Sequence, residues 1–258
     1  MTEVDGLVDD WGLRRDGDVI RGSRTLVLPV RASDGTSAML KVGHSEHEHL
    51  ALRRWNGAGA VRLLRADPHR GALLLERLHA ESLTGLSDVT ACQIIADLYR
   101  RLHRPAMPQL PSLTSLLDQW ADDFAALPRS APVPHRLVSQ AIALCRDLAG
   151  GPADVVLHGD LHYDNVLAAD REPWLATSPK PLNGDPHYEL APMLWHRWDE
   201  LGRNIRVGVQ RRFDALVDAA GLDEERARGY VIVRVVREAT RDPDNLTKYV
   251  ALAKAVQD

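Results

Sequence analysis

The residues best suited to a chemical step lie in segment 155–167, which reads VVLHGDLHYDNVL. Asp160 follows a short apolar run and a glycine, and Asn165 stands five residues later, just before apolar residues resume. In kinase-type sites an Asp accepts the proton of the attacking hydroxyl, and an Asn of the same loop holds Mg²⁺. The spacing therefore predicts phosphoryl transfer, with Asp160 as the base or hydroxyl-orienting carboxylate and Asn165 as a metal ligand.

Each of these residues also has a plain structural interpretation. An Asp after a glycine often caps a turn, and Asn is a common turn residue. The apolar strand before Asp160 and the presence of Asn165 after it favour the catalytic interpretation. His158, at the end of that strand, either braces the loop or is simply buried in the structure, and the sequence leaves both open.

Lys41 is the second candidate, at the end of the apolar run 38–42. A lysine there, with a helix next, can point into a cleft and bind nucleotide phosphates. Glu48 on that helix could hold the lysine in place, with Glu46 as its competitor. The alternative is a lysine whose stem covers apolar surface while its amine reaches water. Beside the 158–165 motif, we favour the phosphate-binding interpretation.

Length and composition limit the class of protein. The chain has 258 residues, of which 45% are hydrophobic and 26% charged, as in an ordinary globular protein. Its formal charge of −4 argues against a nucleic-acid partner. Two cysteines without a disulfide pattern, no signal peptide and no apolar run of about 20 residues predict a cytoplasmic protein without a membrane partner. A small-molecule substrate is expected, and the oligomeric state is not indicated.

Two kinds of segment follow one another along the chain. Short β-prone runs and one helix, expected at 45–55, fill the first ~75 residues, the runs lying at 19–20, 25–30, 38–42, 60–64 and 72–76. After residue 78 a strand–loop–strand unit at 155–177 interrupts a series of helices, at 87–102, 113–127, 136–149, 188–201, 204–220, 223–240 and 245–256. This order predicts an α+β fold with a β-rich nucleotide-binding lobe at 1–77 and a helical catalytic and substrate lobe at 78–258.

Several motifs together resemble the aminoglycoside phosphotransferase family. They are Lys41, a Glu in the next helix, LLLERL at 73–78 and the HGD-x4-N pattern at 158–165. The stretches GAVRLL at 59–64, WLA at 174–176, PKPL at 179–182 and GDPHYELAP at 184–192 are similar to its streptomycin 6-phosphotransferase and hydroxyurea phosphotransferase branch. The resemblance spans essentially the whole chain.

This resemblance implies a bilobal, protein-kinase-like fold with ATP between the lobes. Adenine would lie against the backbone near Glu76 and Leu78, and Lys41 would bind phosphate. Asp160 corresponds to the catalytic Asp and Asn165 to a Mg²⁺ ligand. The implied activity is transfer of the γ-phosphate of ATP to a hydroxyl of an aminoglycoside such as streptomycin, or of hydroxyurea, which confers antibiotic resistance.

The chain departs from the family pattern just before Pro179. Thr177 and Ser178 stand where the family carries an apolar residue and the principal Mg²⁺-binding Asp, and Asn183 stands where an aliphatic residue is usual. A serine hydroxyl is a poor Mg²⁺ ligand compared with a carboxylate. With Asn165 and Ser178 as the predicted metal residues, we predict low activity that Ser178→Asp would raise.

Two further interpretations stay open. One is a catalytically silent, kinase-like protein that binds a nucleotide or a metabolite. The other is a small-metabolite kinase with a sugar or amino-alcohol acceptor. Magnesium dependence distinguishes the first from an enzyme, and a substrate profile distinguishes the second.

Overall fold

A computed structural model describes residues 3–22, 25–43, 46–151, 154–202 and 204–257. The chain divides into two compact units. Unit 1 consists of Met1–Glu81 and Leu167–Lys180, and unit 2 of Ser82–Val166 and Pro181–Asp258. The segment Leu167–Lys180 thus returns to the N-terminal unit, which a sequence division at residue 77 does not include. The mixed α+β fold expected from the sequence is confirmed.

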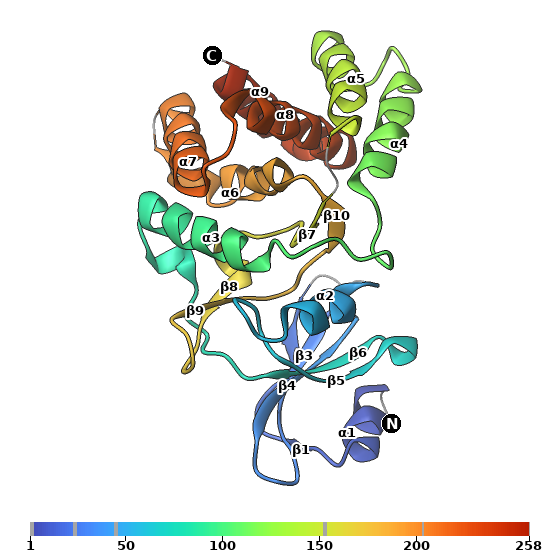
Figure 1. The fold of residues 1–258 in the computed structure, drawn as a ribbon, viewed down its shortest axis with the longest axis vertical. Coiled ribbons are helices and arrows are strands. Elements are labelled where there is room, and N and C mark those ends of the chain that lie inside the picture. The colour runs from blue at the N-terminus through green and yellow to red at the C-terminus, as the bar shows by residue number, and fades with distance from the viewer. Residues whose placement is uncertain (1–2, 23–24, 44–45, 152–153, 203, 258) are drawn as a thin grey trace. The chain divides into compact units, whose positions relative to one another are not determined.

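Unit 1 is built on an antiparallel sheet with the strand order β1-β3-β4-β6-β5, and β2 pairs with β3 (Figure 1). Its strands are β1 (Arg14–Arg15), β2 (Ile20–Arg21), β3 (Leu26–Arg31), β4 (Ser37–Val42), β5 (Leu63–Asp67) and β6 (Ala72–Glu76). In the central strand β4, Lys41 lies opposite Val27 on one side and Leu73 on the other. The lysine is therefore held in a well-defined position by both neighbouring strands.

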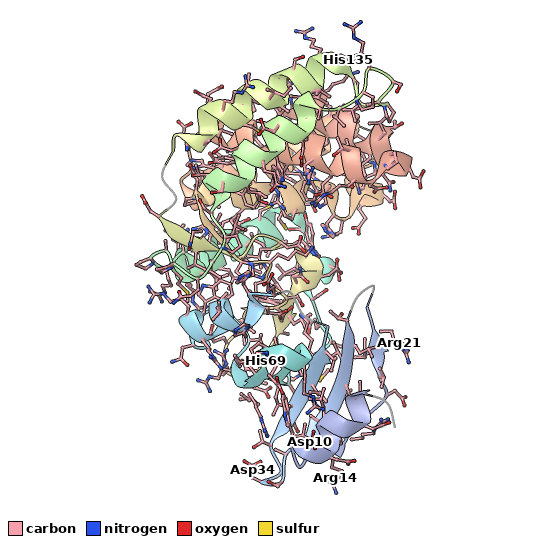
Figure 2. All side chains as sticks on the ribbon, turned by 90° about the vertical axis from the view of Figure 1, so that its right-hand side faces the viewer. Asp10, Arg14, Arg21, Asp34, His69 and His135 are labelled. Carbon is pink, nitrogen blue, oxygen red and sulfur yellow. The ribbon has the colours of Figure 1, made fainter. Side chains whose placement is uncertain are left out.

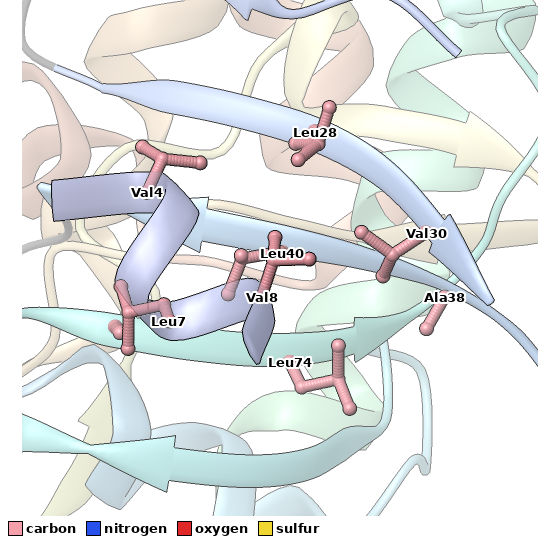
Figure 3. Packing of buried hydrophobic residues seen from close by; sticks show 9 residues of the cluster. Val4, Leu7, Val8, Leu28, Val30, Ala38, Leu40 and Leu74 are labelled. Atoms are coloured by element: carbon pink, nitrogen blue, oxygen red, sulfur yellow. The ribbon is translucent and has the colours of Figure 1, made fainter. Parts of the chain in front are cut away.

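A helix that the sequence interpretation missed, α1 (Glu3–Asp10), covers one face of this sheet. Its Val4, Leu7 and Val8 pack against the sheet residues Leu28, Val30, Ala38, Leu40, Ala72 and Leu74 (Figure 3). Because successive residues of a strand point to opposite faces, burial of Leu40 under α1 directs Lys41 to the other face. The short, acidic helix has only three buried apolar residues, which gave a weak sequence signal.

Two elements near residue 60 differ from expectation. Helix α2 spans Glu48–Trp55 and is capped by Asn56, whose φ is +46°; the expected start at residue 45 lies outside the described residues. The strand expected at 60–64 begins at Leu63 instead. Val61 N–H donates to the carbonyl of Ala176 at 2.9 Å, and Ala176 N–H to that of Gly59 at 2.9 Å. The chain at 59–61 therefore pairs with a distant segment before it joins the sheet.

That distant segment is the hairpin of β8 (Val166–Ala168) and β9 (Trp174–Ala176). Both strands were expected from the sequence as part of one strand–loop–strand unit. The hydrogen bonds between β9 and residues 59–61 explain why the hairpin groups with unit 1.

Unit 2 is mainly helical (Figure 1). Its long helices are α3 (Asp88–Leu102), α4 (Leu113–Ala125), α5 (His135–Ala149), α7 (Ile205–Ala220), α8 (Glu224–Arg241) and α9 (Leu246–Gln257). Ser87 caps α3 as predicted, with its hydroxyl accepting from Thr90 N–H at 3.3 Å. These helices lie close to the predicted ranges, because their apolar periodicity is strong.

The helix expected at 188–201 is broken into three short pieces. They are η4 (Pro186–Leu190), α6 (Ala191–Trp195) and η5 (Trp198–Leu201). His196 has extended dihedral angles and Arg197 has a φ of +50°, so the backbone cannot continue as a helix there. A further strand that was not expected from the sequence, β10 (Leu182–Gly184), pairs with β7 (Val155–Leu157).

Several charged side chains lie at one end of unit 1. Figure 2 labels Asp10, Arg14 and Asp34 at the same end of unit 1, and Asp10 forms an ion pair with Arg70 at 2.7 Å. Among the described residues, no helix is both long and apolar enough to cross a membrane.

Candidate active site

In unit 1, Lys41 lies at the centre of a buried polar cluster. Its Nζ donates to both carboxylate oxygens of Glu48, at 2.8 and 2.9 Å, and to Ser178 Oγ at 3.1 Å. The side chains of Lys41 and Glu48 are almost fully buried, with exposures of 7% and 1%. Glu48 rather than Glu46 is thus the partner of the lysine. Removing one partner of such a pair would leave the other charged and buried, which costs several kcal/mol.

The backbone at Ser178 is in the left-handed region, with a φ of +55°. Among non-glycine residues, Asn and Asp adopt this conformation more readily than Ser. The position therefore accommodates an Asp, the residue that the family pattern carries, without new backbone strain. Serine brings a neutral hydroxyl to the same place beside Lys41.

Glu76 and Leu78 lie at and beyond the end of β6. The Glu76 carboxylate binds Arg171, with Arg171 Nη2 at 2.7 Å from Oε1, and Oε1 also accepts from Arg62 N–H at 2.7 Å. The Glu76 side chain is thus engaged in structural contacts. Leu78 is partly exposed. A role for the two residues in adenine binding through their backbone stays a prediction.

In unit 2, Asp160 and Asn165 belong to one compact loop. Asn165 Nδ2 donates to the backbone carbonyl of Asp160 at 2.8 Å, and Asn165 N–H to the carbonyl of His162 at 3.0 Å. The side chain of Asn165 therefore closes the loop on Asp160, and its amide oxygen is directed elsewhere. The two predicted residues are brought together by a direct contact.

The turn before Asp160 is held by buried charges on both sides. Glu189 accepts from the backbone N–H groups of His158, at 2.5 Å, and Gly159, at 3.0 Å, while Arg234 Nη2 donates to the Gly159 carbonyl at 3.0 Å. Gly159 has a φ of +79°, which a residue with a side chain adopts rarely. Burial alone would raise the pKa of Glu189, but the hydrogen bond and charge of His103 help to hold it below its ordinary value.

The rest of the loop is anchored by Tyr163. Its hydroxyl donates to Asp88 Oδ1 at 3.0 Å, and Asp88 Oδ2 pairs with Arg212 Nε at 3.0 Å. His162 stacks on His196 with ring centroids 3.5 Å apart, and its pKa falls to about 4, mainly because the ring is buried. The two imidazoles lie face to face, and a ring nitrogen of each and a carboxylate oxygen of Asp164 lie within 4.8 Å of one another. These contacts fix the loop residues between Asp160 and Asn165.

Asp185 and Asn183, the two other positions in the family-like stretch 179–192, make structural contacts. Asp185 binds His187 and Arg226, and its pKa stays below the ordinary value because these hydrogen bonds outweigh burial. Asn183 is buried in β10, where it donates to the Met107 carbonyl at 2.6 Å and accepts from Met107 N–H at 2.9 Å. Its amide thus satisfies backbone groups of the loop at 107–110, which an aliphatic side chain could not do.

Sequence reasoning missed three residues that support the site: Arg171, Glu189 and Arg234. Arg234 had a usable signal, since it interrupts the valine-rich run VIVRVV at 231–236, where a lone charge indicates a buried partner. Glu189 and Arg171 gave none, because their partners are far away in sequence. Lys41, Glu48 and Ser178 meet within unit 1, and Asp160 and Asn165 within unit 2.

The two predicted metal residues lie in different units, and each by itself suits Mg²⁺ to a different degree. Asn165 offers an amide oxygen, which suits a hard cation. Ser178 Oγ is neutral and already accepts a hydrogen bond from the Lys41 ammonium. Asn165 therefore fits magnesium, and Ser178 fits it poorly.

Comparisons with known proteins bear on this arrangement. Residues 10–245 match the family described as aminoglycoside/hydroxyurea antibiotic resistance kinase. The chain is 41% identical over 252 residues to streptomycin 6-kinase of Streptomyces glaucescens, covering 93% of this chain and 81% of that protein. It is 42% identical over 244 residues to hydroxyurea phosphotransferase of Kitasatospora aureofaciens, covering 89% of this chain and 69% of that protein.

Solved structures share the fold at low identity. Macrolide 2'-phosphotransferase MphH of Brachybacterium faecium aligns with a TM-score of 0.62 and 15% identity, covering 97% of this chain and 94% of that one. Amicoumacin kinase aligns with a TM-score of 0.64 and 11% identity, covering 100% and 92%. Kinases of this fold generally use ATP and a divalent metal. From the match over most of its length and the identity to curated relatives, the chain belongs to the aminoglycoside/hydroxyurea antibiotic resistance kinase family.

Proposed function

We propose that this chain transfers the γ-phosphate of ATP to a hydroxyl of a small molecule, with streptomycin, a related aminoglycoside or hydroxyurea as the acceptor. The names of the relatives support these acceptors. The observation that carries the proposal is the cluster at Lys41, whose Nζ contacts Ser178 Oγ, 137 positions away, at 3.1 Å. A buried lysine paired with Glu48 is the arrangement that phosphate binding requires.

The proposed chemistry assigns one task to each residue. Asp160 orients the acceptor hydroxyl and takes its proton while the acceptor oxygen bonds to the γ-phosphorus. The bond from that phosphorus to the bridging oxygen breaks, and ADP leaves with the electron pair. Lys41 stabilises the phosphate charge, and Glu48 holds the ammonium in place. Bound Mg²⁺ would neutralise the phosphates, with Asn165 and Ser178 as its ligands from this chain.

The neutral Ser178 predicts a slow enzyme. A fixed electrostatic group aimed at the developing charge is worth about 10²–10³ in rate. The chain has the hydroxyl-orienting loop and the phosphate-binding lysine, but a hydroxyl in place of a metal-binding carboxylate. We therefore expect measurable turnover well below that of a family member with the Asp.

A transfer assay tests this proposal. ATP labelled in the γ-phosphate is incubated with the protein, Mg²⁺ and one of three acceptors: streptomycin, hydroxyurea or a simple amino sugar. We expect labelled streptomycin or hydroxyurea, formed only with Mg²⁺. Label on the amino sugar alone would favour the small-metabolite kinase, and no label on any acceptor would contradict the proposal.

Ser178 also favours a second candidate, a silent protein that binds a nucleotide without turning it over. Its neutral hydroxyl predicts ATP binding with little magnesium dependence. Calorimetric titration of ATP with and without Mg²⁺ separates the two candidates. An ATP affinity that is the same with and without Mg²⁺, in a protein without transfer activity, would support the silent binder.

We further propose a cytoplasmic location without a nucleic-acid or membrane partner. The two cysteines, Cys92 and Cys145, are free and buried, which suits a reducing compartment. The net charge of −4 supports the absence of a nucleic-acid partner.

A further inference from the structure

Arg171, in the turn of the β8–β9 hairpin, is the centre of a hydrogen-bond hub within unit 1. Its Nε donates to Glu76 at 3.0 Å, Nη1 donates to the Gly57 carbonyl at 2.6 Å and to Glu172 at 2.8 Å, and Nη2 donates to the Ala60 carbonyl and to Glu76, both at 2.7 Å. A guanidinium has five N–H donors. All five are therefore matched by acceptors.

The acceptors come from the segments that hold the Lys41 cluster. Gly57 and Ala60 directly follow α2, the helix that carries Glu48. Glu76 is the last residue of β6, which pairs with the Lys41 strand. Arg171 itself lies on the hairpin that leads through β9 to Ser178. One side chain thus joins the three pieces of backbone that bring residues 41, 48 and 178 together.

We propose that Arg171 is a positioning residue for the nucleotide side of the site. By tying the hairpin to residues 57–60 and to Glu76, it keeps residue 178 beside Lys41 without touching the substrate itself. Its functional consequence rests on the phosphotransferase proposed above. The local structural consequence does not, and the two are measured separately.

The geometry of the hub demands an arginine. A lysine has three donors on a single nitrogen and cannot reach two carbonyls and a carboxylate in different directions. In a lysine variant, the carbonyls of Gly57 and Ala60 would lose partners that this partly buried place does not replace. Arg171→Lys should therefore rescue the charge but not the positioning.

Hydrogen exchange in the nucleotide-free protein tests the local claim. The amides of Val61 and Ala176 report directly, because their hydrogen bonds join the two segments that Arg171 ties together. In Arg171→Gln and equally in Arg171→Lys they should exchange at least about tenfold faster. Amides of the β4–β6 ladder should keep their rates. The matched control is Arg65→Gln, which removes a guanidinium from the same unit, 4.6 Å from the Trp11 ring and outside the hub.

Steady-state kinetics test the functional claim. Arg171→Gln should raise the KM for ATP about tenfold while the KM for the acceptor stays unchanged. A loss of folded protein alone would lower the amount of active enzyme without this split. If Arg171→Gln does not fold, Glu76→Gln, which removes the acceptor charge at the same size, should show the same exchange pattern.

Exchange rates at Val61 and Ala176 that match the Arg65→Gln control would overturn the proposal. An unchanged KM for ATP beside faster local exchange would overturn its functional part. If the unmodified protein neither binds nor turns over ATP, the proposed function fails, and the exchange data still decide whether Arg171 positions the hairpin.

Discussion

The Asp160 loop of unit 2 and the Lys41 cluster of unit 1 are built in different ways. Around Asp160, buried charges hold the backbone, since Glu189 binds the amides before it and Arg234 binds the Gly159 carbonyl. Around Lys41, side chains bind one another directly, and one of them, Ser178, is neutral where the family carries an Asp. The loop thus keeps the HGD-x4-N pattern, while the lysine cluster has a hydroxyl at Ser178 in place of the expected carboxylate.

Under the proposed function, this difference places the expected loss of activity at residue 178. The backbone before Asp160 depends on several buried contacts, so a change at Glu189 or Arg234 would disturb the fold as well. Residue 178 contributes one contact at a position that an Asp would also fit. A change in metal binding is therefore possible in this chain without loss of the fold, and the two regions should respond differently to substitution.

Restoring the carboxylate should give the largest effect. Ser178→Asp should raise kcat about 10²-fold, because a charged oxygen ligand would then help to neutralise the phosphates. The measurement is the initial rate of label transfer at saturating ATP and Mg²⁺.

Thr177→Asp is the matched control, since it adds the same charge one residue earlier. Equal rates for Ser178→Asp and the original chain would show that the missing carboxylate at residue 178 does not limit the rate.

Removing the carboxylate that holds the turn before Asp160 should lower the stability of the protein. Glu189→Gln replaces one accepting oxygen by a donor that faces a backbone N–H, so the free energy of unfolding should fall by about 2–4 kcal/mol. Urea denaturation measures this change. Glu225→Gln, at a side chain that is 87% exposed, is the control and should have little effect. A loss as small as that of the control would mean that the loop is not held by Glu189.

Restoring the aliphatic residue at position 183 should harm the protein, whereas restoring the Asp at 178 should improve it. Asn183→Val leaves the Met107 N–H and carbonyl without their partners, so we expect a loss of about 1–3 kcal/mol in the free energy of unfolding. Thermal and urea unfolding measure it. A variant as stable as the original chain would show that the amide is not needed to hold the 107–111 loop.

The smallest effect concerns the acid sensitivity of unit 2. The pKa of Asp185 is lowered in the folded state, so its contribution to stability is present above the unfolded pKa of about 3.9 and is lost as the pH falls below it. Asp185→Asn should flatten the fall in unfolding free energy between about pH 5 and 3. Urea denaturation across this range measures the slope, and an unchanged slope would exclude Asp185 as its source.

The fold was predictable where the sequence pattern is local. Strands such as β4 and helices such as α3 show their period and their caps within a few residues. The hairpin of β8 and β9 was also visible, but its pairing with residues 59–61 was not, because hydrogen bonds between distant segments leave no periodic signal. The break near His196 depends on two backbone dihedral angles that composition does not encode.

The site was predictable to the extent that its residues form motifs. Lys41, Glu48, Asp160 and Asn165 could be named from spacing, and Ser178 from a departure in a known pattern. The supports of these residues could not, since Glu189 and Arg171 act on backbone groups of other segments. Charges that bind carbonyls and amides are set by the fold rather than by neighbouring letters.

The central claim is that Asp160 orients the acceptor hydroxyl in a phosphoryl transfer. Its most direct test is the initial rate of label transfer to the acceptor by the original chain and by Asp160→Asn, with ATP affinity measured on both proteins. We predict a rate lower by about 10²–10⁴-fold in the variant, with unchanged ATP affinity. Equal rates in the two proteins would contradict the account.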